Sequence, residues 1–286
     1  MTASRPRGSL NFSADDPGSI PVRDAATVML LRDGDDGLEV FMLRRNLNSD
    51  FVGGAYVFPG GAVDPADGGA ELDDFVSGRR DAEVSALLGL ERGGLAYWIA
   101  AIRESFEEAG LLLAYDGSGR HVELVEPAVV ERFAEHRRLV DRGERGLVEV
   151  CRAEQLRLAT DAIHYFSRWV TPLGAPRRYD TRFFVALAPE GQTPLHDDRE
   201  VIANLWIRPE DALEQHAAGR FELIFPTVRS LESLMLFDRA AEVIEHAAGV
   251  ESIDPILPRI VEDSGSLRIV LPGDEVYDAV TSRRLS

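Results

Sequence analysis

The chain of 286 residues is 45% hydrophobic and 28% charged, a balance typical of a globular protein of one or two domains, and it excludes disordered and fibrous classes. Its 49 acidic residues outnumber its 31 basic residues, and the formal net charge of −18 argues against nucleic acid or an anionic membrane as a partner. Every basic residue is arginine, which excludes Schiff-base and P-loop lysine chemistry and indicates a GC-rich bacterial source.

The first 21 residues are polar and are interrupted by Pro6, Pro17 and Pro21, with no apolar segment typical of a secretory signal. We expect residues 1–21 to form a flexible N-terminus. No apolar run reaches the length of about 18 residues that a membrane span needs. Cys151 is the only cysteine, so an internal disulfide or a cysteine metal cage is excluded. We therefore predict a cytoplasmic protein without a membrane partner.

Strand patterns come first along the chain. Residues 25–32 and 38–44 are apolar runs, and the turn signal at 33–37 between them predicts a β-hairpin. Residues 53–61 predict a short strand between glycine turns. The acidic, glycine-rich stretch at about 64–94 is typical of a surface insertion.

Helix patterns dominate the centre of the chain. The strongest lies at 95–109, and two amphipathic patterns at about 127–159 predict a helical insertion. Later strand patterns precede a helix that begins at Pro209 and a long helix at 226–248. Strands before and between helices in this mixed order predict an α/β fold, an α/β/α sandwich with a mixed β-sheet. The later strands are expected at 163–170, 181–187 and 201–207.

The helix at 95–109 carries three glutamates on one patch. Glu104, Glu107 and Glu108 stand at i, i+3 and i+4, opposite the apolar face. Three carboxylates within one turn repel one another, and near a helix C-terminus they oppose the helix dipole. Such hard oxygen ligands suit Mg²⁺ or Mn²⁺, with phosphate and water completing the coordination. The glutamates alone leave a solvated acidic face open as the alternative.

Residues 58–61 and 103–111 resemble the Nudix box, a family pattern that ends in Arg-Glu-aliphatic-x-Glu-Glu-x-Gly-aliphatic. Ser105 replaces the first aliphatic residue. On this resemblance the chain is identified as a member of the Nudix hydrolase superfamily, which implies the Nudix fold and a metal-dependent hydrolase. The matching positions are Arg103, Glu104, Glu107, Glu108, Gly110 and Leu111.

Two departures from the family pattern concern the first half of the box. Residues 62–102 separate Gly61 from Arg103, so about 28 residues are inserted relative to the family. The family's first glutamate, which helps to anchor the box arginine, has no counterpart, because Leu95 stands at its position. We expect another acidic side chain to fold back onto Arg103. The candidates that the sequence leaves open are Asp64, Glu83 and Glu91.

Further segments resemble the Nudix-19-type branch, which is associated with coenzyme A (CoA) and acyl-CoA diphosphatase activity. The resemblance implies cleavage of a nucleoside diphosphate-linked substrate, with CoA giving 3′,5′-ADP and 4′-phosphopantetheine. An ADP-ribose, NADH or dinucleotide pyrophosphatase is the alternative within the class. A catalytically inactive Nudix-fold binding or regulatory protein is the alternative outside it. The segments are 54–61, 101–110, 164–172 and 176–184.

The resemblance assigns residues 22–249 to a Nudix hydrolase domain and leaves residues 250–286 as a C-terminal extension with a strand at 266–271. A homodimer is expected at the level of the family.

The predicted metal ligands are Glu104, Glu107 and Glu108, with the carbonyl group of Gly61 as a further ligand implied by the resemblance. Glu200 precedes a predicted strand, where Nudix enzymes often place another metal-binding or base glutamate. Glu200 or one of the helix glutamates would accept the proton of the attacking water. Arg103, the remaining catalytic candidate, is expected to orient a ligand glutamate through a charge-assisted hydrogen bond.

Five arginines are candidates for binding the phosphates of the substrate, because a guanidinium group donates two parallel hydrogen bonds. Salt bridges to the surplus acidic residues are the alternative for the later three. One of the first two is expected to face the site, since side chains alternate along a strand. The candidates are Arg44, Arg45, Arg177, Arg178 and Arg182.

Overall fold

The computed structural model describes residues 20–47, 53–195, 201–263 and 266–277. Within these ranges, seven strands form one mixed sheet with the path β3-β2-β1-β8-β7, to which β4 adds beside β1 and β9 beside β2. Strand β1 pairs in parallel with β8 and antiparallel with β2 and β4. The strands are β1 (Val22–Gly34), β2 (Gly37–Arg45), β3 (Tyr56–Val57), β4 (Gly60–Ala62), β7 (Ile163–Val170), β8 (Arg178–Leu187) and β9 (Val201–Ile207).

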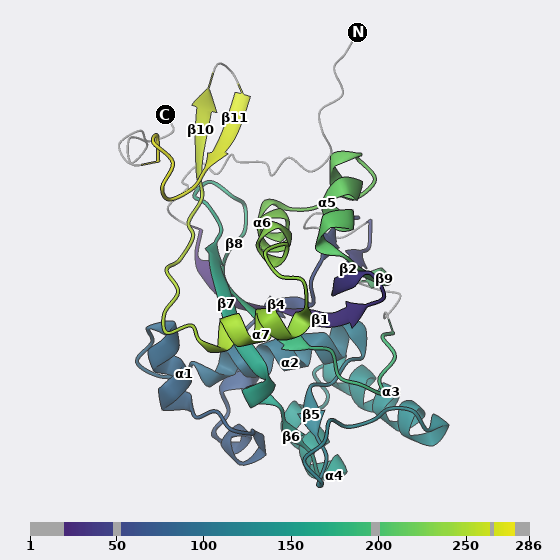
Figure 1. Cartoon of the computed structure of the whole chain (residues 1–286). Helices are drawn as coiled ribbons and strands as arrows, with labels where there is room; N and C mark the ends of the chain where they lie inside the picture. The colour runs from purple at the N-terminus through teal and green to yellow at the C-terminus, as the bar shows by residue number, and fades with distance from the viewer. Residues whose placement is uncertain (1–19, 48–52, 196–200, 264–265, 278–286) are drawn as a thin grey trace.

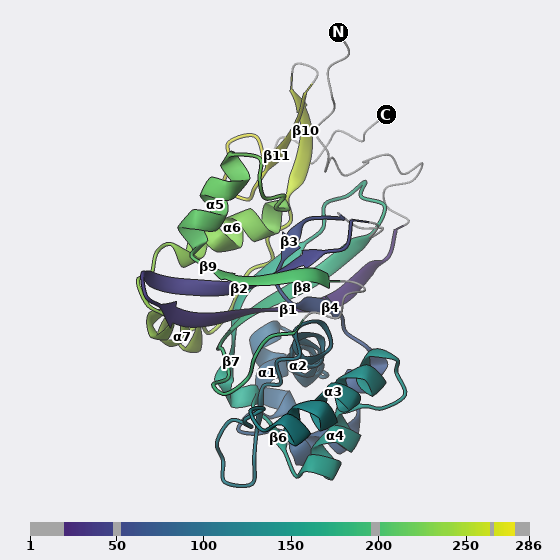
Figure 2. The ribbon, with the colours of Figure 1, turned by 90° about the vertical axis from the view of Figure 1, so that its right-hand side faces the viewer.

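Helices cover both faces of this sheet (Figures 1 and 2). Helices α1 to α4 lie on one face and α5 to α7 on the other, which confirms the predicted α/β sandwich with a mixed sheet. The helices are α1 (Asp81–Leu88), α2 (Leu95–Ala109), α3 (Pro127–Asp141), α4 (Leu147–Glu154), α5 (Pro209–Ala217), α6 (Phe225–Leu234) and α7 (Ala240–Ala248). Two small ribbons complete the fold, β5 (Ala114–Tyr115) with β6 (Arg157–Leu158) and β10 (Arg259–Asp263) with β11 (Ser266–Val270).

Strand β1 separates two hydrophobic cores. Its side chains alternate, so Val28 and Leu30 pack in the core around α2, whereas Met29 and Leu31 pack in the core of α5, α6 and α7. A strand buried on both faces needs apolar residues at successive positions. This double burial explains the continuous apolar run in the sequence of β1.

Helix α2 is almost entirely buried and lies against β1 and β4. The carboxylate of Asp81 accepts hydrogen bonds from the amides of Gly93 (2.9 Å) and Leu95 (3.0 Å) and so satisfies donors at the start of the helix. The indole of Trp98 donates to the carbonyl oxygen of Ile163 at 2.9 Å, which fixes the helix to β7. Gly110 ends the helix with a left-handed φ of 69°.

The two predicted insertions contain regular structure. In the first, two short 3₁₀ segments, η1 (Pro65–Gly68) and η2 (Ala70–Phe75), precede α1. In the second, α3 and α4 are the two predicted helices, and α4 ends earlier than expected, at Glu154, where Gln155 adopts a left-handed φ of 55°. None of the helices in the described ranges is long and apolar enough to cross a membrane.

The single long helix expected at 226–248 is wrong, because the structure has α6 and α7 there with a break between them. The carboxylate of Asp33 in β1 accepts the amide of Ala240 at 2.8 Å, and Glu242 accepts the amide of Asp238 at 3.0 Å. The first contact satisfies the first donor of α7, and the second holds the chain just before it, so that a new helix starts here. Residues 1–19 of the predicted N-terminus lie outside the described residues.

We expect Trp98→Ala to lower the free energy of unfolding by about 3–5 kcal/mol, because it removes a fully buried ring and its hydrogen bond. Denaturant unfolding measures this loss. Leu236→Ala, at a side chain that is 81% exposed, is the control and should change the free energy by less than about 0.5 kcal/mol. Equal stability of both variants would contradict the anchoring role of Trp98.

Candidate active site

The last two turns of α2 face strand β4, which passes directly over the glutamates. The amide of Gly60 donates to Oε2 of Glu108 at 3.0 Å. A Cβ atom on Gly61 would overlap the carboxylate of Glu104, so a side chain here would displace that carboxylate. Strand β4 is itself held in place by antiparallel pairing with β1. The glycines thus allow the backbone to approach the two carboxylates closely.

Arg103 joins the glutamates to one another. Its Nη1 atom donates to Oε1 of Glu104 at 2.9 Å and to Oε2 of Glu107 at 3.1 Å, while Nη2 donates to the carbonyl oxygen of Ala62 at 2.8 Å. Burial alone would lower the pKa of Arg103, but its carboxylate partners raise that pKa above its ordinary value. Arg103 therefore remains charged and holds both carboxylates in place.

Asp67, which sequence reasoning missed, completes the contacts of Arg103. Its carboxylate accepts from Nε at 2.9 Å and from Nη2 at 3.0 Å, and the side chain is almost fully buried. Such a two-point pair fixes the plane of the guanidinium group. Asp67 lies in η1, so the first insertion supplies the anchor that the family takes from the box itself.

The three anchors expected from the sequence have lesser contacts or none. Asp64 is exposed and lies 3.8 Å from Nη2 of Arg103. Glu83 pairs with Arg79 at 3.6 Å, and Glu91 contributes none of the hydrogen bonds or ion pairs that Arg103 makes in the described structure. Asp64 and Asp67 cap η1 together, with the amide of Asp64 donating to Asp67 at 2.8 Å. Acidic residues three apart beside a proline are the sequence signal for such a turn.

Burial raises the pKa of two carboxyl groups on α2. It raises the pKa of Glu107 to about 7, against the opposing effect of Arg103 and with a further contribution from Glu104. Burial also raises the pKa of Glu104, again against the effect of Arg103. One arginine therefore compensates only part of the negative charge, and a cation would compensate the rest.

The donor set fits a divalent metal ion, because three carboxylates and a glycine carbonyl group supply hard oxygen ligands. Glu104 and Glu107 both accept hydrogen bonds from Arg103, and Glu108 accepts one from Gly60. In this arrangement no three acidic, histidine or cysteine side chains of the described residues form a ready-made metal cluster. Glu200 lies outside the described residues, immediately before β9.

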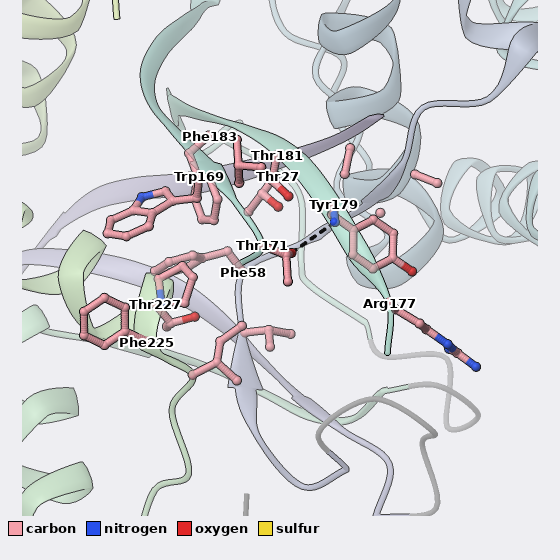
Figure 3. A pocket seen from close by; sticks show the side chains of 18 of the residues that line it. Thr27, Phe58, Trp169, Thr171, Arg177, Tyr179, Thr181, Phe183, Phe225 and Thr227 are labelled. Atoms are coloured by element: carbon pink, nitrogen blue, oxygen red, sulfur yellow. Dashed lines mark hydrogen bonds between the residues drawn. The ribbon is translucent and has the colours of Figure 1, made fainter. Parts of the chain in front are cut away.

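A cavity of about 400 Å³ opens beside these glutamates. Gly60, Gly61, Glu104 and Glu108 contribute to its lining, together with residues of β7, β8 and α6. Figure 3 shows aromatic side chains on one side of this cavity and a tyrosine and an arginine on the other. The labelled aromatic residues are Phe58, Trp169, Phe183, Phe225 and Tyr179.

Two of the five candidate arginines line this cavity, Arg45 and Arg177. Arg44 precedes Arg45 on β2 and instead places its guanidinium group 5.7 Å from the ring centre of Tyr56. Arg45 therefore contributes to the cavity lining and Arg44 does not, and the pairing of β2 with β9 shifts its register between these two residues.

Arg178 and Arg182 lie elsewhere, contrary to their prediction as substrate-binding residues. Arg178 donates to the carbonyl oxygen of Thr171 at 3.2 Å. Arg182 is 2% exposed and pairs with Asp24 at 3.2 Å and with Asp180 at 3.1 Å. Arg182 therefore stabilises the middle of β8 through ion pairs, as the salt-bridge alternative described, whereas Arg178 bonds a backbone carbonyl group at the start of β8.

A mixed sheet between two helical layers, with an arginine and three glutamates on one helix against a glycine strand, defines a hydrolase of the Nudix superfamily. The NUDT19 Nudix domain family matches residues 80–234. The chain belongs to this family and is a Nudix hydrolase of the pyrophosphatase type. Nudix hydrolases generally use a divalent metal ion.

Named relatives are similar over most of the chain. Acyl-coenzyme A diphosphatase NUDT19 of Gallus gallus is 29% identical over 277 residues, which cover 84% of this chain and 72% of the relative. The Homo sapiens protein of the same name is 26% identical over 273 residues, covering 85% and 73%. A crystal structure of a Nudix hydrolase from Alicyclobacillus acidocaldarius superposes with a TM-score of 0.66 at 28% identity, covering 79% of this chain and 97% of that one.

We expect Asp67→Asn to lower the kcat of phosphoanhydride hydrolysis by about tenfold to a hundredfold, because the neutral amide no longer holds the Arg103 guanidinium at two points. Steady-state kinetics with a saturating divalent metal ion measures the effect. Asp74→Asn, at an exposed position of η2, is the matched control. A larger loss for Asp64→Asn than for Asp67→Asn would contradict the assignment.

Gly61→Ala should lower kcat by about a hundredfold, since the new methyl group would displace the Glu104 carboxylate. The matched control is Gly117→Ala, where an added Cβ meets nothing within 4 Å. Kinetics and thermal unfolding are measured for both variants. If Gly61→Ala retains full activity, the close approach of β4 to Glu104 plays no part in catalysis.

Proposed function

We propose that the chain hydrolyses the phosphoanhydride of CoA and acyl-CoA with Mg²⁺ or Mn²⁺, giving 3′,5′-ADP and 4′-phosphopantetheine or its acyl form. The observation that carries this proposal is the composition of one cavity. It has the Nudix glutamates Glu104 and Glu108, two arginines, and an extended apolar wall. A CoA thioester combines the matching parts, a charged diphosphate and an apolar arm. The names of the relatives support the same substrate class.

Glu104, Glu107 and Glu108, with the Gly61 carbonyl group and Glu200, would hold the metal ion. When bound, the cation lowers the pKa of a water molecule and offsets charge on the anhydride oxygens. Glu200 or one of the helix glutamates would accept the proton of the attacking water.

The remaining residues position these groups. Arg103 keeps Glu104 and Glu107 side by side, and the Gly60 amide orients the carboxylate of Glu108. Arg45 and Arg177 lie in the cavity lining and are proposed to bind the substrate phosphates, where a forked guanidinium matches the phosphate oxygens. A chain with a net charge of −18 needs such local cations to accept a polyanionic substrate.

The proposed partner of the chain is its substrate, a small molecule linked to a nucleoside diphosphate. Neither nucleic acid nor a membrane is proposed as a partner. A cytoplasmic location, a GC-rich bacterial source and a homodimer remain predictions. Size-exclusion chromatography with light scattering tests the dimer.

The deciding experiment presents CoA, an acyl-CoA, ADP-ribose and NADH in parallel with Mg²⁺ and with Mn²⁺, and identifies products by mass. Release of 3′,5′-ADP from a CoA compound with the highest kcat/KM supports the proposal. Faster AMP release from ADP-ribose or NADH would replace the substrate and keep the hydrolase. Tight binding of these compounds without turnover of any would instead indicate a regulatory binding protein.

We expect Glu107→Gln and Glu108→Gln each to lower kcat by about a hundredfold or more, because each removes a charged oxygen ligand. A chelator should abolish the activity of the unaltered chain, and either metal should restore it. Glu131→Gln on the exposed face of α3 serves as the matched control. Near-normal rates for both site variants, with unchanged thermal unfolding, would remove the metal-site argument.

A further inference from the structure

The C-terminal extension is attached to the edge of the sheet. The amide of Ile256 donates to the carbonyl oxygen of Arg168 at 2.8 Å, and the amide of Val170 donates to the carbonyl oxygen of Ile256 at 2.9 Å. These bonds place Ile256 beside Trp169 in a parallel bridge. The extension thus continues from the helical layer along β7 and then forms the β10–β11 hairpin (Figures 1 and 2). It lies beyond the residues 80–234 that match the family.

Contacts within the extension join the start of β10 to the segment that follows β11. The guanidinium group of Arg259 lies 3.9 Å from the ring centre of Tyr277 and donates to the carbonyl oxygen of the same residue. The hydroxyl group of Tyr277 donates to the carbonyl oxygen of Leu257 at 2.7 Å. The amide of Leu271 donates to Asp274 at 2.7 Å. A segment braced in this way can serve as a fixed wall.

Two residues of the extension line the cavity of the glutamates, Pro258 and Ile269. Pro258 is buried, whereas Ile269 is 36% exposed and so can contact a molecule in the cavity. On the same wall, Trp169 and Phe225 pack edge to face with ring centres 6.0 Å apart. Ile256 packs against the core cluster that contains Trp169. Residues of the extension and of the core therefore together form one apolar wall of the cavity.

The apolar part of the cavity lining suits one arm of the proposed substrate better than the other. Among the lining residues that the structure describes, only two glutamates and two arginines are charged, and those from the extension are apolar. The 3′-phosphoadenosine arm is anionic and would lose solvation against such a surface. An acyl-pantetheine arm combines apolar chain with two amides, and hydroxyl groups within the lining can meet the amides. These hydroxyl groups belong to Thr27, Thr171, Tyr179, Thr181 and Thr227.

We propose that the C-terminal extension completes a subsite for the acyl-pantetheine arm, with Pro258 and Ile269 as specificity-determining residues. The identity of this arm rests on the proposed function. The diphosphate lies at Glu104 and Glu108, and the acyl chain runs along Trp169 toward the hairpin. The extension thereby favours acyl-CoA over free CoA as the substrate.

The test compares kcat/KM for dodecanoyl-CoA and for CoA in the full-length chain. Ile269→Ser is expected to lower the ratio of kcat/KM for dodecanoyl-CoA to kcat/KM for CoA by about tenfold, since apolar contacts distinguish substrates to this degree. The conservative Ile269→Val keeps a branched apolar side chain and should lower the ratio less than Ile269→Ser does. Leu236→Ser, which changes an exposed apolar residue outside the cavity, controls for stability. Thermal unfolding is measured for all variants.

A binding measurement separates the subsite from the hydrolysis. Calorimetry with S-dodecanoyl pantetheine, which has no diphosphate, should show binding that Ile269→Ser weakens by about tenfold. If CoA compounds are hydrolysed but Ile269→Ser changes neither the ratio nor this binding, the subsite is overturned and the proposed function stands. If no CoA compound is hydrolysed while binding still depends on Ile269, the subsite stands and the proposed function is overturned.

Discussion

The pairing of Arg103 with Asp67 is the constraint on which the arrangement of the site depends. One guanidinium group contacts the first insertion through Asp67, strand β4 through Ala62, and helix α2 through Glu104 and Glu107. Because a guanidinium group is planar, fixing it at two points by Asp67 also fixes the direction of its other donors. Three segments that are separate in the sequence thereby acquire one common geometry beside the cavity.

Local patterns predicted much of this arrangement. Helix periodicity predicted that Glu104, Glu107 and Glu108 lie close together on α2, but not that β4 covers them and that Glu108 is buried. The run of apolar residues in β1 predicted a strand, because burial on both faces requires it. The predicted sandwich and the Nudix hydrolase class are confirmed by the sheet and by the family match.

The features that sequence reasoning missed depend on contacts between distant residues. The sequence does not identify Asp67, because an insertion folds back only in three dimensions and the local turn signal does not show which carboxylate faces Arg103. The break between α6 and α7 arises from Asp33, more than 200 positions earlier in the chain. Arg182 carries the same charge as Arg177, yet burial beside Asp24 and Asp180 commits it to the fold. Charge and residue type therefore identify the candidate residues, but only tertiary packing shows which of them line the cavity and which stabilise the fold.

The origin of Asp67 in the first insertion has a consequence for local stability. The 3₁₀ segment that carries it is only four residues long, and short segments of this kind open more readily than the central sheet. Opening of that segment would release Arg103 while β1, β8 and α2 stay folded. Heating or mild denaturant would then abolish hydrolysis before the circular dichroism signal of the folded chain changes. Hydrolysis and fold would be lost as two successive events, with the insertion as the weaker cooperative unit.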